Sequence, residues 1–140
     1  MNQAALDKTY MLCAEAHALL SKATRAKVGA LIVTPSGALL GGVNGTPSGY
    51  DNTCEIDNVT LDHVLHAEQS AILAAARQGV SLLDSTVYVT LLPCSRCSAM
   101  LAQVKIKRLV YKDDYRDSGG IEMLLDLGIE VEKYQWTQEI

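Results

Sequence analysis

Three potential metal ligands and one carboxylate stand out in this sequence. His66 and Glu68 are separated by a single residue, and Cys94 and Cys97 form a C-x-x-C pair directly after Pro93. Zinc prefers imidazole and thiolate ligands, and a catalytic zinc usually has three protein ligands and an open position for water. We therefore predict that one Zn²⁺ per chain is held by His66, Cys94 and Cys97. Glu68 is then placed beside the metal to move protons.

Each half of this pattern also has other interpretations. A His-x-Glu pair occurs by chance in many short helices, and a C-x-x-C pair can be a redox dithiol or half of a closed structural zinc site. Pro93 in front of the first cysteine disfavours the redox interpretation, and a closed site needs a fourth ligand, which Cys54 or His63 could supply. The 28 positions between His66 and Cys94, with an expected strand just before the cysteines, favour a catalytic site.

Hydrophobic periodicity predicts the elements that position these residues. Apolar residues recur every three or four positions near the N-terminus, which indicates an amphipathic helix with a stripe from Leu6 to Leu20. Short apolar or alternating runs between Gly, Pro and polar clusters indicate strands. Helices are expected over residues 4–21, 66–78, 93–104 and 121–127, and strands over 28–33, 38–43, 86–92, 106–111 and 129–133.

These elements predict an α/β fold with a mixed five-stranded sheet between layers of helices. The turn at Pro35-Ser36-Gly37 makes the first two strands antiparallel, whereas strands separated by helices tend to be parallel. The stretch from residue 44 to about 62 is expected to be a loop. His66 and Cys94 each open a helix, and the partial positive charge of a helix N-terminus favours thiolate over thiol.

Length and charge limit the classes of partner. The 140 residues predict a single domain over 1–140, and the net charge of −4 without any Lys/Arg-rich run disfavours a polynucleotide partner. A single nucleotide phosphate, in contrast, needs only one or two local cations. No apolar run reaches the length of a membrane span, so we expect no membrane association and a cytoplasmic location. Metal ligation by cysteine also fits a reducing compartment.

Together these residues resemble the cytidine deaminase superfamily, and within it the deoxycytidylate (dCMP) deaminases. A His-x-Glu pair followed by Pro-Cys-x-x-Cys is the pattern of zinc deaminases, and the loop over residues 44–49, Asn-Gly-Thr-Pro-Ser-Gly, is similar to that of dCMP enzymes. The similarity extends from about Arg25 to Lys133. Two features depart from the family pattern: Ser70 stands where Asn is usual, and residues 23–25 hold no cysteine for a second zinc.

The resemblance implies a three-layer cytidine deaminase-like fold and the hydrolysis of dCMP to dUMP and ammonia, a reaction that supplies dUMP for dTMP synthesis. It implies that Glu68 shuttles protons and that the Ala67 N–H holds the base carbonyl. It also implies that Asn44 hydrogen-bonds the sugar 3′-hydroxyl, and we favour this role over the alternative, a turn, in which Asn before Gly is common.

Two further residues are candidates for substrate contacts. Arg25 is the leading phosphate ligand, because a guanidinium can hold a phosphate at two points. A solvated surface role is its alternative, and Lys27 and Arg116 are the next candidates. Tyr115 lies after an expected strand, where the resemblance implies the edge of the pocket, with a surface role as its alternative.

Other functions remain open at this point. The same fold could act on cytidine, a modified dCMP, dCTP or guanine, whereas a tRNA adenosine deaminase would need a basic face. A zinc-stabilised binding module without activity would not depend on Glu68. The resemblance also implies a homo-oligomer, with a hexamer favoured, and regulation by dCTP and dTTP. The Ala-rich stretch over residues 71–76 would permit close approach of helices, and Arg77 at its end could reach a neighbouring chain.

Overall fold

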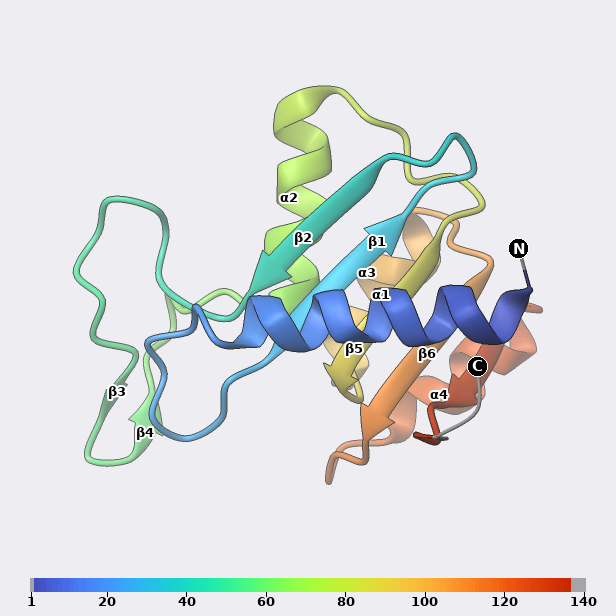
Figure 1. The fold of residues 1–140 in the computed structure, drawn as a ribbon. Helices are drawn as coiled ribbons and strands as arrows, with labels where there is room; N and C mark the ends of the chain where they lie inside the picture. The colour runs from blue at the N-terminus through green and yellow to red at the C-terminus, as the bar shows by residue number, and fades with distance from the viewer. Residues whose placement is uncertain (1, 137–140) are drawn as a thin grey trace.

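The structure is a computed structural model that describes residues 2–136, and it contains a mixed five-stranded sheet covered by helices on both faces (Figure 1). None of the helices in this part of the chain is long and apolar enough to cross a lipid bilayer. The elements are α1 (Gln3–Ala18), β1 (Gly29–Val33), β2 (Leu39–Val43), β3 (Glu55–Ile56), β4 (Val59–Thr60), α2 (Ala67–Gln78), β5 (Thr86–Leu91), α3 (Ser95–Gln103), β6 (Arg108–Asp113), α4 (Gly119–Asp126) and β7 (Glu130–Lys133).

The strand order of the large sheet is β2-β1-β5-β6-β7, which confirms the predicted mixed sheet. β5, β6 and β7 are parallel, and β1 is antiparallel to both β2 and β5. Strands connected through a helix are parallel, as predicted: α2 connects β2 to β5, and these two strands run in the same direction. β1 is antiparallel to β5 because it is joined to β2 by a tight turn and lies between β2 and β5.

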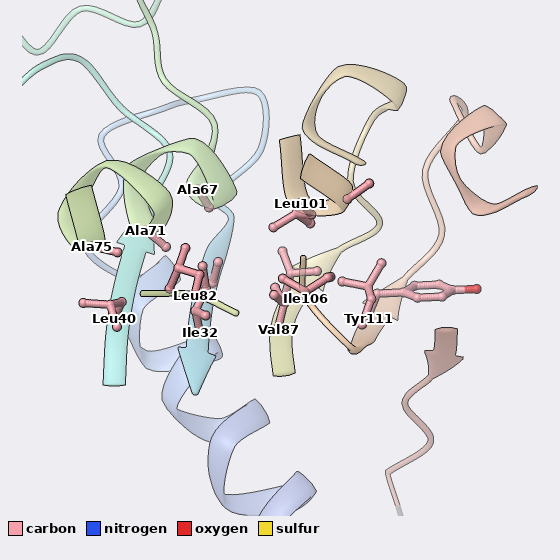
Figure 2. Packing of buried hydrophobic residues seen from close by; sticks show 14 of the residues in the cluster. Ile32, Leu40, Ala67, Ala71, Ala75, Leu82, Val87, Leu101, Ile106 and Tyr111 are labelled. Atoms are coloured by element: carbon pink, nitrogen blue, oxygen red, sulfur yellow. The ribbon is translucent and has the colours of Figure 1, made fainter. Parts of the chain in front are cut away.

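Alternate residues along the strands face opposite helix layers, as the period of two requires. Leu31, Tyr88 and Val110 belong to a small cluster with Met11 and Ala14 of α1. Their strand neighbours Ile32, Val87 and Leu109 belong instead to the larger cluster that includes Ala71, Leu101 and Leu124 of α2, α3 and α4 (Figure 2). One helix thus covers one face of the sheet, and three cover the other.

The structure corrects several predicted boundaries. α1 ends at Ala18 and not at residue 21, and β6 spans Arg108–Asp113 instead of 106–111. α3 begins at Ser95, so Pro93 precedes the helix and does not occupy its first turn. His66 and Cys94 are N-cap residues with extended backbones (ψ 159° and 169°), one position before the helices that they were expected to open.

Two features were missed. The most buried face of α1 consists of Asp7, Met11 and Ala14, so the predicted stripe from Leu6 to Leu20 lies beside the buried face. The expected loop over 44–62 contains the β3–β4 hairpin, turned by Asp57 and Asn58, whose φ angles are 53° and 62°. Positive φ at both central residues is the geometry of a type I′ turn, which Asp and Asn tolerate.

A buried charge network ties α1 to the sheet. The Asp7 carboxylate accepts hydrogen bonds from Arg108 Nη1 and Nη2, both at 2.8 Å, and from the Tyr88 hydroxyl at 2.7 Å. Arg108 also forms ion pairs with Glu130 and Glu132 of β7. Burial alone would raise the pKa of Asp7, but the hydrogen bonds from Arg108, Tyr88 and Gln3 outweigh it and hold that pKa below its ordinary value.

This network predicts acid-sensitive stability. The pKa of Asp7 is lower in the folded chain, so its contribution is present above the unfolded-state value near 3.9 and is lost as pH falls through the folded-state value. Asp7→Asn should lower the free energy of unfolding at pH 7 by about 2–3 kcal/mol. It should also flatten the decline of that free energy in acid. Urea titrations from pH 7 to pH 3 measure both effects, with Asp126→Asn on the exposed face of α4 as the control. Equal pH profiles for parent and Asp7→Asn would contradict the prediction.

Candidate active site

The N-termini of α2 and α3 bring the three predicted metal ligands together. His66 is the N-cap of α2, Cys94 is the N-cap of α3, and Cys97 lies in the first turn of α3. His66 Nδ1 is 3.6 Å from Cys94 Sγ and 3.2 Å from Cys97 Sγ. The ligand atoms of the three residues all lie within 4.8 Å of one another, and no other such His/Cys/Asp/Glu group of three occurs in residues 2–136.

These distances fit a zinc ion. Tetrahedral ligation with Zn–N near 2.0 Å and Zn–S near 2.3 Å separates nitrogen from sulfur by about 3.5 Å. Burial lowers the pKa of His66, which favours the neutral imidazole that binds metals. Burial also raises the pKa of the Cys97 thiol in the metal-free chain, so deprotonation of Cys97 is coupled to metal binding.

Within residues 2–136 no closed four-ligand site is formed. The Cys54 thiol donates a hydrogen bond to the Asn52 carbonyl at 3.4 Å, and the His63 ring packs edge-on against Tyr50 at 5.2 Å. Neither residue belongs to the metal cluster. Three ligands without a fourth are typical of a catalytic zinc and not of a structural one.

Gly42 on β2 allows α2 to approach the sheet closely enough to place its first turn. A Cβ at Gly42 would lie 2.1 Å from the Ala67 carbonyl oxygen and 2.6 Å from the Ala71 nitrogen. The His66 N–H donates to Gln69 Oε1 at 2.7 Å, which caps the helix from within its first turn. The position of Glu68 therefore depends on backbone contacts between α2 and β2.

Glu68 is a buried carboxylate beside the metal ligands, with only 3% of its surface exposed. Burial raises the pKa of Glu68 to about 7, although hydrogen bonds from the Cys97 thiol and from its own backbone partly oppose this shift. A carboxylate with a pKa near neutrality is suited to both accepting and donating protons.

A cavity of about 200 Å³ opens beside this cluster. Its walls include all four predicted substrate contacts, and a space of this size suits a small molecule and not a folded macromolecule. The lining residues are Ala23, Arg25, Ala26, Val28, Asn44, Glu55, Thr60, Val64, His66, Ala67, Glu68, Leu91, Leu92, Cys94 and Tyr115.

Asn44 has a structural role in this wall. Its side-chain oxygen accepts a hydrogen bond from the Val28 N–H, and its Nδ2 donates to the Ala26 carbonyl, both at 2.8 Å. The amide therefore joins the end of β2 to the segment that precedes β1. An Asn amide has two N–H hydrogens, so one remains for a ligand in the cavity.

Arg25 is held at the cavity by the β3–β4 hairpin. Its Nη1 lies 3.3 Å from Thr60 Oγ1, and Glu55 accepts hydrogen bonds from the backbone N–H groups of Thr24 and Arg25 at 3.0 Å and 3.1 Å. Arg25 forms no direct ion pair within residues 2–136. Its guanidinium is a cation on the cavity wall, and the Glu55 carboxylate on the same wall interacts with it electrostatically.

Glu55 and Thr60 were not predicted as site residues, because strands of two residues are too short to show an alternating apolar and polar pattern. Asp57-Asn58 between Ile56 and Val59 is the signal that could have revealed the hairpin. The two reserve cations lie elsewhere: Lys27 lines a neighbouring hollow, and the Arg116 guanidinium lies 5.6 Å from the Tyr115 ring centre.

Comparison with known proteins agrees with this site. Residues 4–113 match the family described as the cytidine and deoxycytidylate deaminase zinc-binding region. ComE operon protein 2 of Bacillus subtilis is 30% identical over 145 aligned positions, which cover 100% of this chain and 77% of that protein. Deoxycytidylate deaminase of Enterobacteria phage T2 is 48% identical over 69 positions, which cover 48% of this chain but only 37% of the phage enzyme.

A solved structure resembles nearly the whole chain. The dCMP deaminase from the cyanophage S-TIM5, crystallised in complex with dCMP and dUMP, superposes with a TM-score of 0.89 and 41% sequence identity. The match covers 96% of this chain and 99% of the cyanophage chain. The three-layer fold inferred from the sequence is therefore confirmed.

Proposed function

Because this chain belongs to the cytidine and deoxycytidylate deaminase family, we propose that it is a zinc-dependent dCMP deaminase that converts dCMP and water to dUMP and ammonia. The observation that carries the proposal is the 41% identity, over almost its whole length, with an enzyme crystallised with dCMP and dUMP. The cavity supports it, since its lining includes the Arg25 cation and the buried Glu68 carboxylate beside a three-ligand candidate metal site.

The residues of the chain divide the chemistry between them. His66, Cys94 and Cys97 hold the zinc, which when bound supplies the Lewis acidity that lowers the pKa of a water toward 7. Glu68 accepts a proton from the attacking water and delivers it to N3 of the pyrimidine. Glu68 then takes a second proton from the new C4 hydroxyl and passes it to the amine, so that the C4–N bond breaks, ammonia leaves and the C4 carbonyl of dUMP forms.

The remaining lining residues orient the nucleotide. Ala67 is the first residue of α2, where backbone N–H groups have no acceptor within the helix, and its N–H holds the base carbonyl. The free N–H of the Asn44 amide contacts the sugar 3′-hydroxyl. Arg25 binds the phosphate, and Tyr115 closes the edge of the cavity.

An assay of ammonia release tests this function against its nearest alternatives. Zinc-loaded protein should act on dCMP with a kcat/KM well above that for deoxycytidine, cytidine, dCTP or guanine. A preference for any of those compounds would replace dCMP with another small substrate on the same fold. Cytosine deaminase of Candida albicans, a relative named for a free base, is 36% identical to this chain over 69 positions.

Arg25→Ala should separate the nucleotide from the nucleoside. A charge-assisted contact to phosphate contributes roughly 1.5–3 kcal/mol, so kcat/KM for dCMP should fall by about one to two decades. The weak activity on deoxycytidine should hardly change, because that substrate carries no phosphate. Steady-state kinetics on both substrates measure the difference.

Lys27→Ala is the matched control for Arg25→Ala, since Lys27 lies outside the cavity and should leave both activities unchanged. Equal losses on dCMP and deoxycytidine in Arg25→Ala would mean that Arg25 supports the fold. Unchanged kinetics in Arg25→Ala would move the phosphate site to another cation, with Arg116 beside Tyr115 as the next candidate.

We also infer a homo-oligomer, a hexamer by family resemblance, in the cytoplasm. The outer surface of α2 supports close association, because Leu73 is 48% exposed there and Ala76 and Arg77 are exposed beside it. Light scattering should give the mass of about six chains, and a monomer at working concentration would contradict the inference.

We further infer regulation by nucleotides from the family resemblance. Adding dCTP to the assay should raise the rate of deamination, and adding dTTP should lower it.

A further inference from the structure

The N-terminus of α3 lacks a cap of its own because a metal ligand occupies the capping position. An N-cap side chain normally accepts a hydrogen bond from a backbone N–H of the first helical turn. Cys94 holds that position in α3 and makes no such bond, and its thiol lies near His66 instead. The first turn, which also carries Cys97, therefore needs an acceptor from elsewhere in the chain.

Asp117 supplies that acceptor from the loop between β6 and α4. Its Oδ2 accepts the Ser95 backbone N–H at 2.9 Å, and its Oδ1 accepts the Ser95 hydroxyl at 2.7 Å. The same Oδ1 accepts the Gly119 N–H at 3.2 Å, at the start of α4. One carboxylate thus joins the first residue of α3 to the first residue of α4.

Packing between the two helices reinforces this junction. A Cβ at Gly120 would lie 2.3 Å from Ser98 Oγ, so α4 rests directly on α3 one turn after Asp117. Tyr115, two residues before Asp117, lines the cavity. The loop that carries Tyr115 is therefore tied at its far end to the same helical turn that carries the thiols.

We propose that Asp117 is a positioning residue that fixes the first turn of α3, with the thiols of Cys94 and Cys97, against the loop that places Tyr115 on the cavity wall. The metal part of this proposal, the positioning of the two thiols, concerns only the zinc site. Its kinetic part, the placing of Tyr115 for substrate binding, rests on the proposed dCMP deaminase function.

Zinc release from the loaded protein tests the metal part. Asp117→Ala should release zinc to the chromogenic chelator 4-(2-pyridylazo)resorcinol about 10–100-fold faster than the parent, which is the usual effect of removing a partner that orients a metal ligand. Asp117→Asn keeps one oxygen acceptor but cannot accept from both Ser95 groups, so its release rate should be intermediate. Ser95→Ala keeps the backbone N–H bond and should have the smallest effect.

Matched measurements separate this role from a loss of fold. Asp126→Ala on the exposed face of α4 should release zinc at the parent rate. The unfolding temperature of each metal-free variant shows whether the change is confined to the metal site. If Asp117→Ala does not fold, the zinc-release rates of Asp117→Asn and Ser95→Ala provide the test. Adding Ser95→Ala to Asp117→Ala should accelerate release no further, because both substitutions break the same hydrogen bond.

The kinetic part predicts a higher KM for dCMP in Asp117→Asn at full zinc occupancy, because the loop that carries Tyr115 loses one of its two hydrogen bonds to Ser95. The proposal would be overturned if Asp117→Ala released zinc at the parent rate. If Asp117→Ala does not fold, parent-like release in both Asp117→Asn and Ser95→Ala would overturn it instead. If the parent does not deaminate dCMP, the proposed function fails while the zinc measurement still decides the role of Asp117.

Discussion

Glu68→Gln should keep its zinc and its fold but lose deamination of dCMP by roughly 10²–10⁴-fold, the usual contribution of general acid–base catalysis. An amide has the shape of the carboxylate but cannot accept a proton at the pH of the assay. Zinc should stay, because Glu68 is not among the three clustered ligands. The fold should also stay, because a neutral amide avoids the cost of a buried charge at a side chain that is 3% exposed.

Ammonia release, zinc content and the unfolding temperature measured on one preparation check this prediction. Glu122→Gln, an exposed carboxamide variant in α4, should match the parent in all three. Turnover near the parent rate in Glu68→Gln would show that another group moves the protons. If the zinc-loaded parent is inactive on dCMP, deoxycytidine, cytidine, dCTP and guanine, a zinc-stabilised binding module would be favoured instead.

The metal site could be predicted from sequence because its chemistry depends on residue type and local spacing. Cys94 and Cys97 lie in one helical turn whatever the rest of the fold does, and thiolate with imidazole is a narrow choice of ligands. The 28 positions to His66 leave room for a helix and a strand, which the structure places there as α2 and β5. Hence the three residues of the candidate metal cluster could be named from the sequence, and the starts of α2 and α3 were predicted to within two residues.

The cavity wall was harder to predict because its contacts are long-range and involve backbone atoms. Glu55 binds backbone N–H groups 30 and 31 positions earlier, and Asp117 binds Ser95 across 22 positions. Neither contact leaves a periodic pattern in the sequence. The predicted residue Asn44 lies on the cavity, but two of its polar atoms are used by the backbone at 26 and 28.

The sheet shows a similar division. The β1–β2 hairpin and the parallel β5-β6-β7 set follow from loop lengths and crossover helices. The place of β1 between β2 and β5 does not follow from loop lengths. It depends on which strand faces pack against the helices. Asp7 on the buried face of α1 was also not foreseen, since a carboxylate is buried only where a distant partner such as Arg108 neutralises it.

Removing zinc should abolish activity and destabilise the protein together. A ligand at 100 to 1,000 times its dissociation constant stabilises the folded state by about 2.7–4.1 kcal/mol. For a chain of this size that corresponds to a fall in unfolding temperature on the order of 10 °C after treatment with a chelator. Without the metal, Glu68 has no activated water to deprotonate, so the loss of turnover should exceed that of Glu68→Gln. One equivalent of zinc per chain should restore both properties.

Variants of the cysteines show which thiols hold this zinc. Cys97→Ala should purify with less than one equivalent and resemble the chelated parent, because its thiol lies 3.2 Å from His66 Nδ1 inside the cluster. Cys13→Ser is the matched control, since Cys13 lies in α1 outside the cluster, and it should keep one equivalent and full activity. Two equivalents in the parent would require a second site, and a zinc-free active parent would contradict the mechanism. Because Cys97 is fully buried, its substitution could also destabilise the fold directly. The unfolding temperature of Cys97→Ala must therefore be compared with that of the chelated parent. Equal temperatures would assign the whole destabilisation to the missing metal.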